Sequence, residues 1–193
     1  PAVANVNKMA IVIAARSPSP DYDLLDKLLI TCEVKEIKPV ICINKVDLDE
    51  NDESKRIETA YSKAGYTILR LSSVMKIGYE DLRKELSDNI TVFAGQSGVG
   101  KSTILNNIMN LMVMKTGEVS ERLERGKHTT RHAELMELTD GGFVVDTPGF
   151  SSFELEGIEY NEIERYYPEF SKSLGNCKFT GCSHISEPGC SVK

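Results

Sequence analysis

Residues 95–102 carry the strongest chemical signal in the chain. They follow the pattern G-x-x-x-x-G-K-S, which is typical of a phosphate-binding loop. In such a loop, successive backbone N–H groups surround an anion, and the following helix directs its positive end toward that anion. Lys101 is expected to contact the β- and γ-phosphates of a nucleotide, and the Ser102 hydroxyl to ligate Mg²⁺. The residues predicted to bind the phosphates are Gly95, Gln96, Ser97, Gly98, Val99, Gly100, Lys101, Ser102 and Thr103.

A second motif, N-K-x-D, is formed by Asn44, Lys45 and Asp47 and is typical of guanine recognition. Guanine presents N1–H and its exocyclic amine side by side, and one carboxylate, here that of Asp47, can accept both. Adenine offers no such pair, so the carboxylate would be left unpaired beside it. Asn44 is expected to tie this loop to its neighbours, and the Lys45 stem to cover one face of the base. The alternative is a solvated turn, since these residue types are common in turns.

Two shorter motifs extend the expected site. Ser72 and Ser73 follow a strand-like run and could offer a backbone N–H to guanine O6, although a serine pair after a strand is a weak signal. Residues 146–149 read D-T-P-G and follow another apolar run. Asp146 is expected to hold Mg²⁺ through water, and the Gly149 N–H to sense the γ-phosphate.

Residues 125–132 form a basic segment with three fixed positive charges, two histidines and no acidic residue. It lies between the phosphate loop and the D-T-P-G motif. We expect either Thr129 or Thr130 to complete the Mg²⁺ shell when a γ-phosphate is present, and the sequence does not decide which. The alternative is an exposed basic loop without any ligand role.

Apolar runs and helical spacings alternate along the chain, which predicts strands and helices in turn. Strands are predicted at residues 9–14, 40–43, 66–71, 90–94 and 143–145. Helices are predicted around residues 24–29, at 57–64 with Gly65 ending the helix, around 79–86, after the phosphate loop at 104–109, and at 163–170. This alternation predicts an α/β protein with a parallel sheet and helices on both faces. Ligands of such sheets bind beyond the carboxyl ends of the strands, so we expect the motifs to meet at one rim.

The composition predicts a soluble globular protein, and the phosphate-loop motif favours a location in the cytoplasm. The chain has 193 residues, of which 40% are hydrophobic and 27% charged, and its formal net charge is −6. A uniformly basic nucleic-acid binder is excluded by this charge, so any RNA contact must use a local patch. The apolar run at residues 9–15 is too short to span a bilayer, and no membrane partner is expected. The chain begins at Pro1 rather than Met, so we expect it to be part of a longer protein.

The order of the motifs is unusual, because N-K-x-D precedes the phosphate loop. Ordinary GTPases run from phosphate loop to switch threonine, D-x-x-G and then N-K-x-D. With G-Q-S-G-V-G-K-S, G-K-H-T-T-R-H, D-T-P-G-F and the cysteine-rich tail, the chain resembles the RsgA (YjeQ) family of circularly permuted GTPases. The resemblance implies a P-loop GTPase fold with permuted motif order over residues 1–155, and a small zinc-binding module over residues 156–193. It also implies an N-terminal OB-fold domain and C-terminal helices in the family, neither of which is visible here.

The resemblance implies a function as well. Members of this family hydrolyse GTP, bind the 30S ribosomal subunit late in its maturation, and are stimulated by the ribosome. The implied partners are therefore GTP and GDP, the 30S subunit and its 16S rRNA, and we expect the protein to be a monomer.

The cysteines indicate a metal site rather than disulfides. The chain has five cysteines, and three of them lie in its last seventeen residues. A P-loop nucleotidase is normally cytosolic, where thiols stay reduced, and Cys32 and Cys42 fit apolar core patterns. The spacing Cys177-x₄-Cys182-x-His184-x₅-Cys190 corresponds to the zinc module of the family and supplies three thiolates and one imidazole, enough for a closed tetrahedral structural site. Free thiols in a loop are the alternative.

Hydrolysis needs a group that orients the attacking water. Many GTPases place glutamine directly after the D-x-x-G glycine, whereas this chain has Phe150 there, which cannot do so. We therefore expect slow intrinsic hydrolysis, with His128 orienting the water once the ribosome orders the basic segment. The alternative for His128 is a phosphate or RNA contact.

Two other functions are compatible with a phosphate-binding loop. A ribosome- or RNA-binding module with a regulatory nucleotide site draws some support from Phe150. A P-loop kinase is disfavoured by N-K-x-D and D-T-P-G, and no acceptor-site residues are recognisable.

Overall fold

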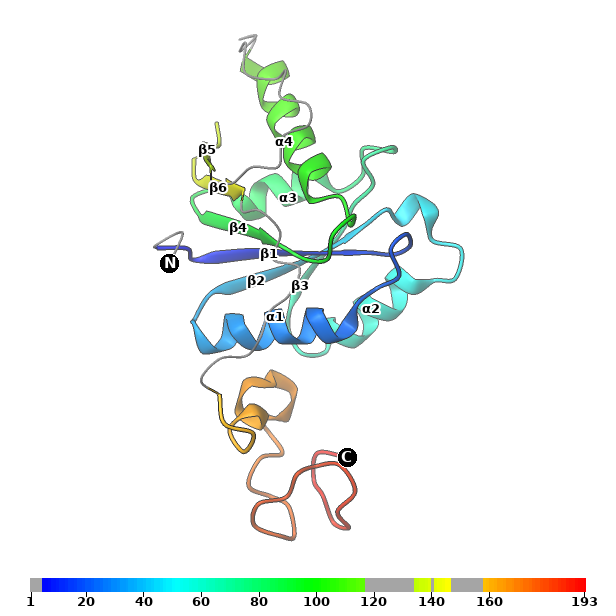
Figure 1. Ribbon diagram of the computed structural model, residues 1–193, viewed down its shortest axis with the longest axis vertical. Coiled ribbons are helices and arrows are strands. Elements are labelled where there is room, and N and C mark those ends of the chain that lie inside the picture. The colour runs from blue at the N-terminus through cyan, green and yellow to red at the C-terminus, as the bar shows by residue number, and fades with distance from the viewer. Residues whose placement is uncertain (1–4, 117–133, 140, 147–157) are drawn as a thin grey trace.

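The protein is built around one mixed sheet with helices on both faces (Figure 1). The computed structural model describes residues 5–116, 134–139, 141–146 and 158–193. The strands are β1 (Lys8–Ala14), β2 (Lys38–Asn44), β3 (Thr67–Arg70), β4 (Ile90–Ala94), β5 (Glu134–Glu137) and β6 (Phe143–Asp146), and their order in the sheet is β3-β2-β1-β4-β6-β5. The α-helices are α1 (Tyr22–Val34), α2 (Glu53–Ser62), α3 (Tyr79–Leu86) and α4 (Lys101–Thr116).

The central strand β1 is buried on both faces, which explains its unbroken apolar sequence. Side chains alternate along a strand, so Met9, Ile11 and Ile13 face α1 while Ala10 and Val12 lie in the core beneath α3 and α4. Figure 1 shows α1 and α2 on one side of the sheet and α3 and α4 on the other. Hydrophobic packing on both faces therefore holds the sheet in place, and the sheet in turn positions the loops at its strand ends.

Helix α1 begins where the sequence provides a cap. The Asp21 side chain accepts a hydrogen bond from the Leu24 N–H at 3.0 Å, which satisfies one of the unpaired donors of the first turn. The helix then buries Leu24, Leu25, Leu28 and Leu29, the face expected from their spacing. Within the described residues, no helix has the length and apolar character needed to cross a bilayer.

The predicted strands are confirmed to within two residues at each end, but the sheet is not wholly parallel. Strand β5 was not predicted, and it pairs antiparallel with β6 at the edge of the sheet. Its sequence, Glu-Leu-Met-Glu, has acids at both ends, and Leu135 is exposed. Such a short edge strand lacks the apolar run by which the buried strands were recognised.

The predicted helix over residues 163–170 is wrong. The structure has two short 3₁₀ turns there, η3 (Ile163–Tyr166) and η4 (Pro168–Phe170). Tyr167 between them is extended, with φ −104° and ψ 102°. A residue that precedes proline is forced out of the helical region by the proline ring, so Pro168 divides the apolar stripe. The η3 turn contacts α1, and the cysteine-containing loops follow beyond it (Figure 1).

Candidate nucleotide-binding and metal sites

The phosphate-loop motif occupies the turn between β4 and α4, as expected. A Cβ on Gly95, whose φ is +136°, would lie 2.1 Å from the Val12 carbonyl oxygen. A Cβ on Gly100, whose φ is +99°, would lie 2.4 Å from Asn44 Nδ2. Both positions therefore require glycine, because the loop runs directly against the ends of β1 and β2.

Within this loop, Val99 is buried whereas Ser97, Ser102 and Thr103 are exposed. The Lys101 ammonium donates to the carbonyl oxygens of Gly95 at 2.6 Å and Gln96 at 2.9 Å. The Lys101 ammonium is thus hydrogen-bonded to carbonyl oxygens of the loop itself. The hydroxyls of Ser102 and Thr103, in the first turn of α4, are open to solvent. This arrangement suits a polyanion at the N-terminus of α4.

Asn44 joins the guanine motif to the phosphate loop. It ends β2, is 2% exposed, and donates from Nδ2 to the Val99 carbonyl oxygen at 2.8 Å. Its amide oxygen is also buried and has no hydrogen-bond partner among the described residues. The tie expected from the sequence is therefore present.

Lys45 forms a second hydrogen bond between the guanine motif and the phosphate loop. Its backbone is left-handed, with φ +60°, and its ammonium donates to the Gly98 carbonyl oxygen at 2.8 Å and to that of Ser17. Three loops, those after β1, β2 and β4, meet at this side chain. The stem remains the part of Lys45 that is predicted to cover a base.

The Asp47 carboxylate is oriented from the next loop. Ser72 is fully buried, and its hydroxyl donates to Asp47 Oδ1. The Ser72 backbone is itself fixed by two hydrogen bonds with Ile77, each of 3.2 Å. Ser72, although part of a weak sequence signal, therefore has a positioning role: its hydroxyl orients Asp47, the acid that is predicted to recognise guanine.

Asp146 ends β6 beside the phosphate loop. Strand β6 is parallel to β4, with Val145 opposite Val92, so the last residue of β6 lies at the same rim as the loop that follows β4. His128, Thr129, Thr130, Gly149 and Phe150, together with the boundary expected at residues 155–156, lie outside the described residues.

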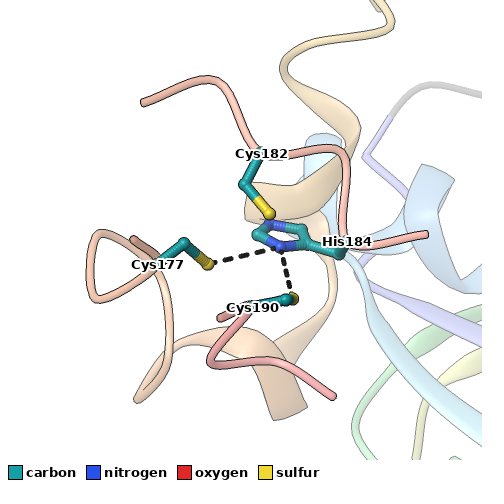
Figure 2. Close-up of side chains that lie close together, drawn as sticks. All are labelled: Cys177, Cys182, His184 and Cys190. Carbon is teal, nitrogen blue, oxygen red and sulfur yellow. Dashed lines mark hydrogen bonds between the residues drawn. The ribbon is translucent and has the colours of Figure 1, made fainter. Parts of the chain in front are cut away.

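A second candidate site lies in the C-terminal loops, where Cys177, Cys182, His184 and Cys190 converge (Figure 2). Their ligand atoms all lie within 4.8 Å of one another. His184 Nδ1 is 3.6 Å from Cys177 Sγ and 3.4 Å from Cys190 Sγ. A tetrahedral zinc ion, with bonds of about 2.3 Å to sulfur and about 2.0 Å to nitrogen, separates these atoms by about 3.5 Å. The four side chains predicted as ligands therefore fit zinc.

The other nitrogen of His184 has a partner that the sequence analysis missed. Nε2 lies 2.7 Å from Glu164 Oε2, on the η3 turn that contacts α1. A carboxylate at this atom holds the Nε2–H tautomer and leaves Nδ1 as the ligand atom. The two residues are twenty positions apart, and no local pattern identified the pair.

Two more polar residues shape the metal loops. The Ser191 N–H and hydroxyl each lie 3.4 Å from Cys177 Sγ and lower the pKa of that thiol to about 7. Glu187 accepts hydrogen bonds from the Ser183 hydroxyl and from the N–H groups of Ser183, Ile185 and Ser186. The bonds from the Ser183 hydroxyl and N–H are the main cause that lowers the pKa of Glu187 to about 2. These contacts order the loop between Cys182 and Cys190.

Comparisons with known proteins agree with this arrangement. The model of the family described as RsgA GTPase matches residues 1–156. The small ribosomal subunit biogenesis GTPase RsgA of Ruminiclostridium cellulolyticum is 62% identical over 192 residues, which are 100% of this chain and 63% of that protein. The protein of the same name from Clostridium kluyveri is 47% identical over 193 residues, covering 100% of this chain and 67% of that one.

Solved structures show the same fold. The crystal structure of YjeQ from Thermotoga maritima superimposes with a TM-score of 0.78 at 34% identity, covering 98% of this chain and 64% of that one. YloQ, a circularly permuted GTPase, gives a TM-score of 0.72 at 38% identity and covers 98% of this chain and 61% of that one. The chain thus spans a little under two thirds of the first of these relatives and of both solved structures.

Proposed function

Because the chain belongs to the RsgA GTPase family, we propose that it binds GTP at the rim of its sheet and hydrolyses it to GDP and phosphate. One observation carries this proposal: side chains of the guanine motif form hydrogen bonds with the backbone of the phosphate loop. Asn44 donates to the Val99 carbonyl oxygen, and Lys45 donates to that of Gly98. A single nucleotide can therefore place its base on Asp47 and its phosphates on residues 95–102.

In this proposal, one set of residues binds the base and another set binds the phosphates. Asp47 accepts hydrogen bonds from the two donors of guanine. The Ser72 N–H already donates to the Ile77 carbonyl oxygen, so of this pair the Ser73 N–H is the one that contacts O6. Lys101 and the loop amides neutralise the phosphate charge, and Ser102, together with Asp146 through water, would hold Mg²⁺. When bound, that ion supplies further charge neutralisation at the phosphates.

Hydrolysis also uses residues of the basic segment 125–132 and of the D-T-P-G motif at residues 146–149. Thr129 or Thr130 would complete the Mg²⁺ shell, the Gly149 N–H would sense the γ-phosphate, and His128 would orient the attacking water. Replacing His128 with alanine is expected to abolish most of the ribosome-stimulated turnover while GTP binding persists. Intact stimulated turnover in this variant would exclude His128 from that role.

The site acts, we propose, in maturation of the small ribosomal subunit, the role printed in the names of the relatives. The partners are the 30S subunit and its 16S rRNA, in the cytoplasm, with the protein acting as a monomer and not on a membrane. Residues 1–155 form the nucleotide-binding domain. Residues 156–193 form a module in which zinc, held by Cys177, Cys182, His184 and Cys190, has a structural role because all four of its positions are filled by protein.

The test is phosphate release from GTP by the full-length protein, with and without 30S subunits and with ATP as the control. We expect slow release alone, faster release with 30S subunits, and none from ATP. GTP binding without any turnover would support a nucleotide-regulated binding module instead. Equal turnover of ATP would contradict the guanine site.

A further inference from the structure

The loop that carries Ser72 and Ser73 is attached to helix α4 by a small polar network. The Tyr79 hydroxyl lies 2.7 Å from Ser73 Oγ and accepts a hydrogen bond from Asn107 Nδ2 at 3.0 Å. The Lys76 ammonium donates to Asn107 Oδ1 at 2.9 Å. The amide of Asn107 therefore bonds both the first residue of α3 and the loop that precedes it.

The chemistry of these partners fixes the orientation of the Asn107 amide. An ammonium can only donate, so Oδ1 must face Lys76, and the NH₂ group is left to donate to the tyrosine oxygen. Tyr79 is 2% exposed and lies in the same hydrophobic cluster as Leu82 and Ile104. Its ring is thus held by packing between α3 and α4, and its hydroxyl presents a fixed point to Ser73.

This network connects the two halves of the nucleotide site along a route separate from Asn44 and Lys45. Helix α4 begins at Lys101, at the phosphate end. The loop at its other contact contains Ser72, whose hydroxyl donates to Asp47, and Ser73, whose N–H is the one proposed above to contact guanine O6. The position of the base-contacting groups therefore depends on a side chain of the phosphate-binding helix.

We propose that Asn107 and Tyr79 are positioning residues that hold the guanine-contacting loop in register with the phosphate-binding helix. This inference rests on the proposed guanine-nucleotide site. It assigns a role in base affinity to two residues that contact neither base nor phosphate.

The experiment measures GDP affinity of the full-length protein in the variants Asn107→Ala and Tyr79→Phe. We expect each to bind GDP about 3- to 10-fold more weakly, the effect of losing a hydrogen bond that preorganises the loop. Alanine favours a helix more than asparagine does, so Asn107→Ala should leave α4 intact. The matched control is Asn106→Ala, at an exposed position of the same helix, which should bind GDP as the wild type does.

Competition by inorganic tripolyphosphate distinguishes positioning of the base loop from general damage. Its affinity should be unchanged in both variants, because it reports only the phosphate end. The double variant should lose no more than the weaker-binding single variant, since both changes break the same link. Thermal unfolding without nucleotide confirms that each variant is folded.

Wild-type GDP affinity in both Asn107→Ala and Tyr79→Phe would overturn the inference, and so would an equal loss of tripolyphosphate affinity. These results differ from failure of the proposed function, in which the wild-type protein itself would not bind GDP.

Discussion

The proposed nucleotide-binding domain and the proposed C-terminal module are stabilised in different ways. The described residues of the first region, 8–116, 134–139 and 141–146, contain a sheet whose central strands are buried on both faces, and their site loops are fixed by side chains such as Asn44 and Ser72. Residues 158–193 are described throughout and contain no strand or α-helix, and only Cys182 among them is buried. In the first region a buried apolar core preorganises the nucleotide site. In the second region the four clustered metal ligands take the structural role that a core has in the first.

This difference determines what a perturbation can do. In the nucleotide-binding domain, removal of one polar group should change ligand affinity while the sheet survives. In the C-terminal module, loss of the proposed zinc ion should remove most of the folding free energy, because so small a segment buries too little apolar surface to fold alone.

The largest expected effect is that of zinc removal. After chelation, residues 158–193 should lose their hydrogen-exchange protection, since zinc binding supplies about 10 kcal/mol or more of folding free energy in small zinc modules. Strands β1, β2 and β4 should keep their protection because their core is built from apolar side chains. Unchanged protection of residues 158–193 in protein shown by metal analysis to be zinc-free would show that this module folds without the metal.

Next in size is the effect of Asp47→Asn in the nucleotide-binding domain. The variant loses two charge-assisted hydrogen bonds, so GDP affinity should fall about 100-fold. Affinity for xanthosine diphosphate should rise, because xanthine has a carbonyl where guanine has its amine and can accept a hydrogen bond from asparagine. Calorimetric titration with both nucleotides measures this, and zinc content should stay at the wild-type value. Equal GDP affinity in the two proteins would exclude Asp47 from base recognition.

A smaller effect is expected for Glu164→Gln. The loss of the carboxylate beside His184 Nε2 should lower zinc affinity about 10-fold, as changes to residues that orient metal ligands do. Competition against a chromogenic chelator measures it, with Glu162→Gln on the same segment as the matched control. If both variants bind zinc like the wild type, Glu164 does not orient the ligand.

The smallest effect concerns Asp49, which accepts hydrogen bonds from the Glu53 and Ser54 N–H groups at the start of α2. Burial raises the pKa of Asp49, but these bonds and one from the Ser54 hydroxyl outweigh it and leave the pKa lowered. Asp49→Ala should therefore reduce the free energy of unfolding by about 1 kcal/mol at neutral pH.

The pH dependence of this effect follows from the sign of the shift. A lowered pKa stabilises the fold above the unfolded value of about 3.9, and the contribution disappears as the pH falls through the folded value. Urea unfolding of the nucleotide-binding domain at neutral and acidic pH measures the difference between Asp49→Ala and wild type. A difference that persists at the lowest pH would contradict the capping role.

The features predicted from the sequence are those with local patterns. Buried strands are continuous apolar runs, so β1, β2 and β4 were found, together with the motifs that follow them. The Cys177–Cys190 ligand set was identifiable because its residue types are few and its spacing is short.

The features that were missed depend on contacts between distant residues or on a single blocking residue. Glu164 becomes important only when the chain folds back to His184, and Asn107 only when α4 packs beside Tyr79. The 163–170 stripe had helical spacing, but Pro168 made a continuous helix impossible, and periodicity alone does not register that restriction.

The most direct test of this account is a calorimetric titration of the zinc-loaded, full-length protein with GDP and with ADP. If residues 44–47 and 95–102 bind the two ends of one guanine nucleotide, GDP should bind at least about 100-fold more tightly than ADP, with one site per chain. Equal affinities, or no binding of GDP, would contradict the central claim.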